Sequence, residues 1–202
     1  MRVITGIARG RRLKTPKGSD VRPTADHVKE ALFNILRDDV EGRRVLDLFA
    51  GTGQLGIEAL SRGAREAVFV DASSDSLKLV KENLSLCGFE AQVVKSDAIS
   101  YLSRCKKFDL IFLDPPYDTD LYEKTLEAIK SFDILSEGGI IIAEARRERQ
   151  LPEMLSPYCR QKEYVYGSMK LCTYARQTCE DVSGPLPETG DGNEHSDLSG
   201  QF

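Results

Sequence analysis

The sequence predicts an α/β fold built on one mostly parallel, seven-stranded sheet that ends in a C-terminal antiparallel hairpin. Two observations predict it. Short apolar runs alternate with segments of helical periodicity between residues 44 and 144, and these runs are almost wholly apolar, as expected when helices cover both faces of a sheet. The length of 202 residues suffices for one such domain with small additions.

The predicted elements follow in chain order. The N-terminal part is expected to hold a short β-hairpin and then a helix, over residues 2–7 with 11–15 and over residues 23–38. Strands of the sheet are predicted at 44–48, 67–70, 91–95, 108–113 and 139–144. Helices are predicted between them at about 54–62, 75–86, 97–103 and 120–131. A helical turn after Pro152 and two β-rich runs complete the chain, at 158–165 and 169–176.

Charge is distributed unevenly along the chain. Residues 1–22 carry seven basic side chains against one acidic one, whereas residues 177–202 carry six acidic side chains and no Lys or Arg. The net charge of −4 therefore hides a local basic surface, which is typical of nucleic-acid contact. We expect a basic N-terminal extension, a core domain and an acidic, disordered tail, over residues 1–40, 41–176 and 177–202.

Composition excludes several classes of protein. No apolar run approaches the about 20 residues of a membrane-spanning helix, and the N-terminus lacks the apolar core of a signal peptide, so we expect a cytoplasmic protein without a membrane partner. The five cysteines are scattered without Cys-x-x-Cys spacing, and there are only two histidines. Neither a metal site nor a disulfide framework is therefore expected.

A glycine-rich turn follows the first core strand. Gly51, Gly53 and Gly56 have the spacing G-x-G-x-x-G at a strand-to-helix junction, and Asp71 comes 20 residues after Gly51 at the end of the next strand. By itself this pattern is a dinucleotide-binding fingerprint, with the acid placed to accept hydrogen bonds from ribose hydroxyls.

Asp47, at the end of the first strand, favours a different ligand. A pyrophosphate at the glycine turn would face this added negative charge, whereas the amino group and sulfonium of S-adenosylmethionine would be attracted by it. Asp97 opens the helix after the third strand, beside Ala98, and is expected either to accept the adenine amine or simply to cap the helix. We predict S-adenosylmethionine as the cofactor.

The fourth strand ends in Asp114-Pro115-Pro116-Tyr117. Two successive prolines fix the backbone and remove two N–H donors, which leaves a rigid acceptor edge beside a carboxylate and an aromatic ring. Such a group suits a planar base that carries an exocyclic amine. The carboxyl ends of parallel strands lie at one edge of a sheet, where ligands bind, so the four acids at the strand ends are expected to lie together.

At this point the chain resembles the RsmD family of 16S rRNA guanine-N2 methyltransferases, within the class I S-adenosylmethionine-dependent methyltransferases. The resemblance extends to about residue 176 and rests on segments that include "ITGIARGRRLKTP", "RPTADHVKEALFNIL", "VLDLFAGTGQLGIEAL" and "FDLIFLDPPY". It implies a Rossmann-like methyltransferase domain and a monomer whose partner is 16S rRNA, within an assembling small ribosomal subunit. The strand end Glu144-Ala145-Arg146 matches the family loosely and receives no role.

The predicted site residues form three sets. Direct, in-line methyl transfer to a guanine N2 amine is assigned to Asp114, Pro115, Pro116 and Tyr117, with Asp114 and the Pro115 carbonyl accepting the two N–H bonds and Tyr117 stacking on the base. Cofactor binding is assigned to Asp47, Gly51, Gly53, Gly56, Asp71, Asp97 and Ala98. Contact with RNA phosphates is assigned to Arg9, Arg11, Arg12, Lys14 and Arg22.

Three alternatives stay open. The Asp-Pro-Pro-Tyr motif is shared with enzymes that methylate adenine N6 or cytosine N4 of DNA or RNA, although the chain has no room for a separate target-recognition domain of about 100 residues. A nicotinamide-dependent oxidoreductase uses the same glycine turn, but Asp47 argues against it. A catalytically silent RNA-binding module is the third alternative.

Overall fold

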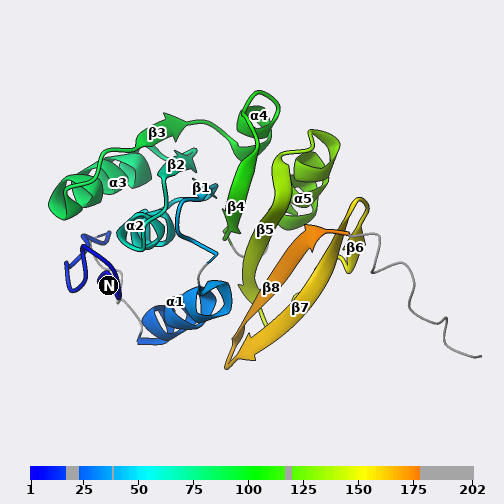
Figure 1. Ribbon diagram of the computed structural model, residues 1–202, viewed down its shortest axis with the longest axis horizontal. Coiled ribbons are helices and arrows are strands. Elements are labelled where there is room, and N and C mark those ends of the chain that lie inside the picture. The colour runs from blue at the N-terminus through cyan, green and yellow to red at the C-terminus, as the bar shows by residue number, and fades with distance from the viewer. Residues whose placement is uncertain (17–22, 38, 117–119, 178–202) are drawn as a thin grey trace, which may run out of the picture.

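The computed structural model describes residues 1–16, 23–37, 39–116 and 120–177. Its strands form one eight-stranded sheet of order β3-β2-β1-β4-β5-β8-β7-β6 (Figure 1). The strands are β1 (Arg44–Asp47), β2 (Glu66–Asp71), β3 (Gln92–Lys95), β4 (Phe108–Leu113), β5 (Leu135–Arg146), β6 (Met154–Leu155), β7 (Tyr158–Tyr166) and β8 (Met169–Arg176). The helices are α1 (Pro23–Leu36), α2 (Gln54–Ser61), α3 (Ser74–Cys87), α4 (Ala98–Leu102) and α5 (Leu121–Ser131).

The predicted α/β architecture is confirmed. Strands β1 to β5 are parallel to one another, and β6, β7 and β8 are antiparallel to their neighbours. All seven predicted strands are present, and the two-residue β6 adds an eighth where we expected a helical turn after Pro152. The backbone there pairs with β7 instead, because Met154 lies opposite Cys159 and Leu155 opposite Tyr158 across a tight turn.

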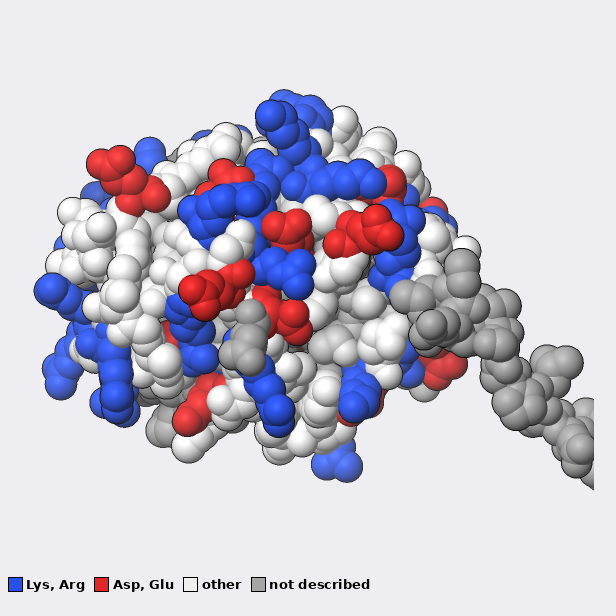
Figure 2. Space-filling view, in the orientation of Figure 1, with Lys and Arg blue, Asp and Glu red and all other residues white. Residues whose placement is uncertain are grey.

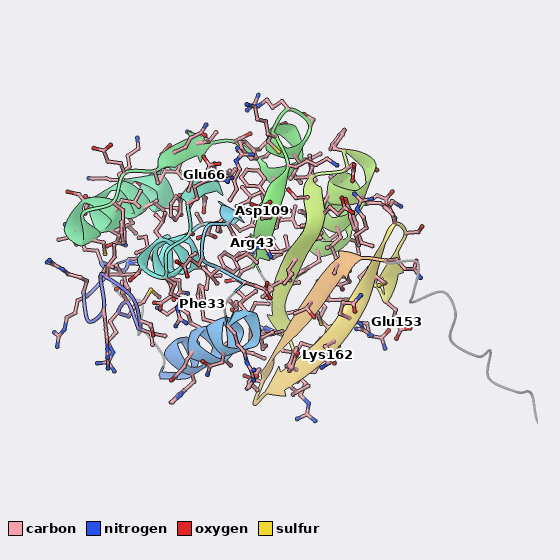
Figure 3. All side chains as sticks on the ribbon, viewed as in Figure 1. Phe33, Arg43, Glu66, Asp109, Glu153 and Lys162 are labelled. Atoms are coloured by element: carbon pink, nitrogen blue, oxygen red, sulfur yellow. The ribbon has the colours of Figure 1, made fainter. Side chains whose placement is uncertain are left out.

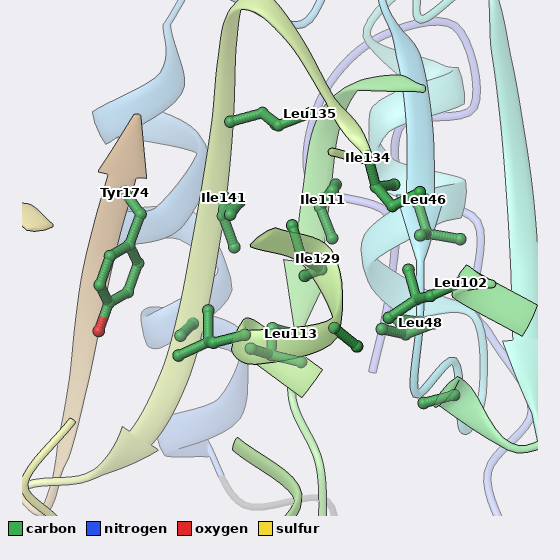
Figure 4. Close-up of a cluster of buried hydrophobic side chains, with 14 of the residues drawn as sticks. Leu46, Leu48, Leu102, Ile111, Leu113, Ile129, Ile134, Leu135, Ile141 and Tyr174 are labelled. Atoms are coloured by element: carbon green, nitrogen blue, oxygen red, sulfur yellow. The ribbon is translucent and has the colours of Figure 1, made fainter. Parts of the chain in front are cut away.

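Helices cover both faces of the parallel strands. Leu46, Ile111 and Ile141 project from β1, β4 and β5 towards α4 and α5, where they pack with Leu102 and Ile129 (Figure 4). These residues are buried, so this face alone removes a large apolar area from water.

The alternate residues of the same strands, Val45, Leu110 and Ile142, project to the other face, where α1, α2 and α3 lie (Figure 1). Phe33 of α1, which Figure 3 labels, packs edge-to-face on Phe112 of β4, with ring centroids 5.7 Å apart. The period-2 alternation of the strands thus supplies both layers of the core. Among the described residues, no helix is long and apolar enough to cross a bilayer.

The N-terminal segment, which we define as residues 1–16, differs from the predicted hairpin. Its two halves do pair antiparallel near Arg2 and Arg12, and the N–H groups of Val3, Gly10 and Leu13 donate to the carbonyls of Arg11, Val3 and Met1. The backbone N–H groups of Ile4 and Thr5 donate to the carboxylate of Glu58 on α2, at 2.7 and 2.9 Å, and not to an opposing strand. The hairpin is therefore shorter than predicted, because a side chain from another element takes the donors of Ile4 and Thr5.

The N-terminal segment packs closely against the C-terminal end of α2. Ala8 N–H donates to the hydroxyl of Ser61 at 3.0 Å, and Ile7 N–H donates to the Ser61 carbonyl at 2.9 Å. A Cβ on Gly6 would lie 1.7 Å from that carbonyl oxygen, so only glycine permits this approach. Val3 is buried in the same core as α1, which joins the segment to the sheet domain.

Glu58 is fully buried and also binds Arg62 Nε at 2.9 Å and Lys29 Nζ at 3.9 Å. Glu58→Ala is expected to lower the free energy of unfolding by about 3–5 kcal/mol, because it breaks a buried ion-pair network. Urea unfolding followed by circular dichroism measures this loss. Glu82→Ala removes the exposed ion pair with Lys14 at 2.8 Å and is the control, with an expected loss below about 1 kcal/mol. Equal losses for the two variants would contradict this role of Glu58.

Candidate active site

A cavity of about 550 Å³ opens at the carboxyl edge of the parallel strands. It lies beyond the ends of β1, β2 and β4, which is where open α/β sheets bind ligands. Its described lining residues are Leu48, Phe49, Gly51, Asp71, Ala72, Ser73, Ser76, Ser96, Asp97, Ala98, Asp114, Pro115, Pro116 and Leu121. Three of the four acids predicted to lie together, Asp71, Asp97 and Asp114, therefore meet at this cavity, and Asp47 does not line it.

The glycine turn joins β1 to α2. Gly51 lines the cavity, whereas Gly53 is the N-cap of α2 and has a φ of 77°. Gly56 lies in the first turns of α2, and a Cβ there would come within 2.4 Å of the Phe69 ring on β2. The third glycine thus permits close packing of the helix on the sheet, and neither it nor Gly53 is among the described lining residues.

Asp71 lies at the end of β2 and lines the cavity. Its Oδ2 accepts the N–H of Gly51 at 2.9 Å, and its Oδ1 accepts the N–H of Ser73 at 2.7 Å. The carboxylate therefore holds the glycine turn in place, and each oxygen keeps a second lone pair for a ligand.

Asp97 caps a helix and also lines the cavity. It is the N-cap of α4, since its Oδ1 accepts the N–H of Ser100 at 2.9 Å, and this bond lowers its pKa. Asp97 also lines the cavity, beside the buried Ala98. Capping fixes the carboxylate at the cavity wall and does not remove it from the site.

Asp47 is placed deeper than the other acids. Its side chain is 3% exposed, its Oδ2 accepts the N–H of Gly56 at 2.9 Å, and it is not among the described lining residues. Burial raises its pKa to about 7, and the charges of Asp114 and Asp71 contribute to the rise. Asp47 thus supports the glycine turn from below, and its charge lies behind the cavity wall.

Asp114, Pro115 and Pro116 line the end of the cavity next to α5. Asp114 is half-buried, Pro115 is buried and Pro116 is exposed. Burial raises the pKa of Asp114. Tyr117, the predicted stacking residue, lies outside the described residues.

A further acid, Glu144, is brought to this edge by β5. It is half-buried, and burial together with the neighbouring Asp114 raises its pKa. Glu144 is not among the predicted site residues. The available signal was the same as at the other strands, an acid directly after the buried run Ile141, Ile142, Ala143.

The predicted RNA-contacting residues lie on the N-terminal segment. Arg9, Arg11 and Arg12 are exposed, and Lys14 is exposed but forms an ion pair with Glu82. Figure 2 shows basic side chains that project from the side of the molecule where Figure 1 places this segment. Arg22 lies outside the described residues.

Asn83 of α3 connects the N-terminal segment to the glycine turn. Its Oδ1 accepts the N–H of Lys14 at 2.7 Å, and its Nδ2 donates to the carbonyls of Lys14 and Thr52 at 3.1 and 2.9 Å. Asn83 therefore fixes the position of the N-terminal segment relative to the glycine turn, which borders the cavity. Within the described part of the chain, no three His, Cys, Asp or Glu side chains are grouped so as to hold a metal ion.

Comparison with solved structures identifies the fold. The Escherichia coli protein yhhF, provisionally named a methyltransferase, has a TM-score of 0.78 and 32% identity, over 88% of this chain and 98% of that one. The Thermus thermophilus protein TTHA0928 has a TM-score of 0.74 and 30% identity, over 88% and 99%. The T. thermophilus 16S rRNA methyltransferase RsmC is 24% identical with a TM-score of 0.67, over 80% of this chain and 45% of that one, which shows a shared fold. The predicted Rossmann-like methyltransferase fold is confirmed.

Comparison of sequences identifies the family. A family model described as "Conserved hypothetical protein 95" matches residues 1–175. The Bacillus subtilis (strain 168) protein YlbH, provisionally named an rRNA methyltransferase, is 41% identical over 88% of this chain and its own full length. The "Ribosomal RNA small subunit methyltransferase D" of E. coli (strain K12) is 35% identical over 88% of this chain and 90% of that one. These matches confirm the resemblance found in the sequence: the chain belongs to the RsmD family of ribosomal RNA small subunit methyltransferases.

Proposed function

We propose that this chain transfers a methyl group from S-adenosylmethionine to the exocyclic N2 of a guanine in 16S rRNA. The observation that carries the proposal is that one cavity wall holds both Asp71, an acid suited to a ribose, and the Asp114-Pro115 acceptor edge suited to a base amine. Homologues of this chain are named as methyltransferases of small-subunit rRNA.

The described lining residues fit the cofactor. Leu48, Phe49 and Ala98 offer an apolar wall for an adenine ring, and Asp71 keeps lone pairs for ribose hydroxyls. When bound, S-adenosylmethionine supplies a methyl group on a positively charged sulfur. A cavity whose described lining has three acids and no Lys, Arg or His suits such a cation. The same charge disfavours the pyrophosphate of a nicotinamide cofactor.

At the other end of the cavity, the chain orients the base. The N2 lone pair of guanine is delocalised into the ring and is a poor nucleophile. Asp114 and the Pro115 carbonyl accept the two N–H bonds and aim the lone pair at the methyl group, so orientation and electrostatic placement supply most of the rate increase. The raised pKa of Asp114 suits it to take the proton that leaves after transfer. Tyr117 stacks on the base in this proposal.

The RNA is held by residues 1–40. Arg9, Arg11 and Arg12 contact phosphates, and the 86% exposed Ile7 lies among them as an apolar contact. The target guanine must leave its stack to enter the site, so a looped or single-stranded guanine fits better than a duplex. In this proposal the chain acts as a monomer in the cytoplasm, on an assembling small subunit.

The product identifies the reaction. Purified protein is incubated with labelled S-adenosylmethionine and either small-subunit rRNA from a strain that lacks the gene or duplex DNA, and nucleosides are analysed by mass spectrometry. N2-methylguanosine in the RNA and none in the DNA is expected. N6-methyladenosine in the DNA would overturn the proposal.

Asp114→Ala is expected to lower turnover by about 100-fold or more, because an oriented acceptor is lost at the reacting atom. Its affinity for S-adenosylhomocysteine, measured by calorimetry, should stay within a few-fold of wild type. Asp71→Ala is the matched comparison, and we expect it to weaken that affinity by about 10-fold or more. Near-wild-type turnover of Asp114→Ala would remove Asp114 from the chemistry.

A variant with Arg9, Arg11 and Arg12 all changed to Gln is expected to bind rRNA more weakly. The slope of log affinity against log salt should fall by about 2, since each phosphate contact contributes about 0.7 on single strands. Fluorescence titrations at several salt concentrations measure it. The control changes the same net charge at three exposed residues elsewhere, Arg65, Lys106 and Lys162. Equal slopes for the two triple variants would refute a local RNA surface.

Asp47→Asn is expected to stabilise the ligand-free protein at high pH. The Asp47 pKa is raised from 3.8 to about 7 in the folded state, so folding disfavours its ionised form. The resulting loss of stability begins as pH rises past 3.8 and is complete above about 7. Asn keeps an oxygen that accepts the Gly56 N–H and has no charge to bury. The increase in the free energy of unfolding of Asp47→Asn over wild type should therefore be about 3 kcal/mol larger at pH 8 than at pH 5.

Thermal unfolding at the two pH values measures the gain, with the exposed Asp75→Asn as the control. The same Asp47→Asn variant should bind S-adenosylmethionine less tightly relative to the uncharged S-adenosylhomocysteine, since a negative charge near the sulfonium is lost. A lower midpoint for Asp47→Asn at pH 8 would show that the carboxylate is stabilising.

A further inference from the structure

Glu144 lies next to Asp114 at the carboxyl edge of the sheet. Strands β4 and β5 are parallel with Leu113 opposite Ala143, so Asp114 and Glu144 are the next residues on two adjacent strands. In the strand order, β5 lies on the side of β4 away from β1. Asp114 therefore stands between the cofactor cavity, which it lines, and Glu144, which is not among the described lining residues.

These two carboxylates differ from the other acids of the edge in their hydrogen bonding. Asp47, Asp71 and Asp97 each accept at least one backbone N–H. In the described part of the chain, neither Asp114 nor Glu144 accepts a hydrogen bond at its carboxylate or pairs with a basic side chain within 4.0 Å. Half-buried carboxylates without donors are costly, so this pair fits a ligand that brings N–H groups with it.

The backbone beneath Glu144 is firmly held. The hydroxyl of the buried Tyr122 on α5 donates to the Glu144 carbonyl at 2.5 Å, and Leu171 of β8 pairs with Glu144 on the other side. A side chain on such a fixed strand position can discriminate between ligands by small differences in geometry.

Guanine differs from adenine and cytosine in the group beside its amine. The N1 position of guanine carries an N–H, whereas the corresponding ring nitrogen of adenine or cytosine is an acceptor. In the proposed function, Asp114 and the Pro115 carbonyl take the two N2 hydrogens, and this acceptor edge alone would serve any of the three amines. A third acceptor next to Asp114 matches guanine and opposes the lone pair of the other two bases.

On the basis of the proposed function, we propose that Glu144 is a specificity-determining residue that accepts the N1–H of the target guanine. It selects guanine against adenine and cytosine, a selection that the Asp-Pro-Pro-Tyr motif does not provide. Three N–H groups of the base then meet three acceptors, from Asp114, Pro115 and Glu144.

The test compares Glu144→Gln with Glu148→Gln, the same change at an exposed residue just beyond β5. Each protein is assayed with labelled S-adenosylmethionine and small-subunit rRNA from a strain that lacks the gene, and methylated nucleosides are identified by mass spectrometry. Glu144→Gln should lower kcat/KM for N2-methylguanosine by about 10- to 100-fold, since the carboxyl acceptor of N1–H is replaced by an amide that can turn its donor towards N1. It should also raise the share of N6-methyladenosine or N4-methylcytidine, because the Gln amide donates to their ring nitrogens.

Two further readouts separate this role from a structural one. Affinity for S-adenosylhomocysteine should match wild type in both variants, and Glu144→Asp, which keeps the carboxylate, should retain the guanine preference. Should Glu144→Gln fail to fold, wild-type enzyme is inhibited with guanosine monophosphate and with its 1-methyl derivative, which lacks N1–H. Stronger inhibition by the unmodified nucleotide supports the inference, and equal inhibition overturns it.

The outcomes distinguish the two proposals. Wild-type formation of N2-methylguanosine together with an unchanged rate and product in Glu144→Gln would overturn the role of Glu144 and leave the proposed function intact. A wild-type enzyme that forms only methylated adenine or cytosine would overturn both, because Glu144 would then face a ring nitrogen without a hydrogen.

Discussion

The parallel pairing of β1 with β2 and β4 is the constraint on which the site depends. It places Asp47 opposite Phe69 on one side and Phe112 on the other. Asp71 and Asp114 each follow those residues by two positions and so reach about 6.6 Å further along the strands. This stagger explains why Asp47 is buried beneath the glycine turn while Asp71 and Asp114 line the cavity. This register thus separates an acid that supports the glycine turn from two acids that line the cavity.

Much of the fold and of the site is predictable from the sequence, because both depend on local patterns. Alternating apolar runs identify the strands, and the glycine spacing identifies the turn. The N-terminal hairpin is shorter than predicted because the N–H groups of Ile4 and Thr5 bind Glu58, more than 50 residues away, and no local pattern reveals that competition. The position of Glu144 next to Asp114 was not predicted, because it depends on β5 lying beside β4 in the sheet. The residue spacing within each strand carries no information about that order.

The acids at the carboxyl edge of the sheet fall into two groups, which differ in their hydrogen bonding. Backbone N–H groups satisfy Asp47, Asp71 and Asp97, which support the glycine turn or open a helix, so their charges are partly compensated in the absence of ligand. Asp114 and Glu144 receive no such donors from the described residues, and they stand at the end where the base is proposed to enter. In the proposed function, the protein compensates the charges that organise it, and the carboxylates of Asp114 and Glu144 receive their donors from the substrate.

Hydrogen bonds from α2 and α3 also connect the basic N-terminal segment to the cavity. Helix α2 begins at the glycine turn and carries Glu58, which binds the N-terminal segment, while Asn83 of α3 binds both that segment and the Thr52 carbonyl. The segment that carries Arg9, Arg11 and Arg12 is therefore attached to the sheet domain. In the proposed function, phosphates bound to these arginines lie at a set position relative to the cavity, so that RNA affinity contributes to orienting the target base and not only to capturing the RNA. A flexible basic tail of equal charge would supply the capture without the orientation.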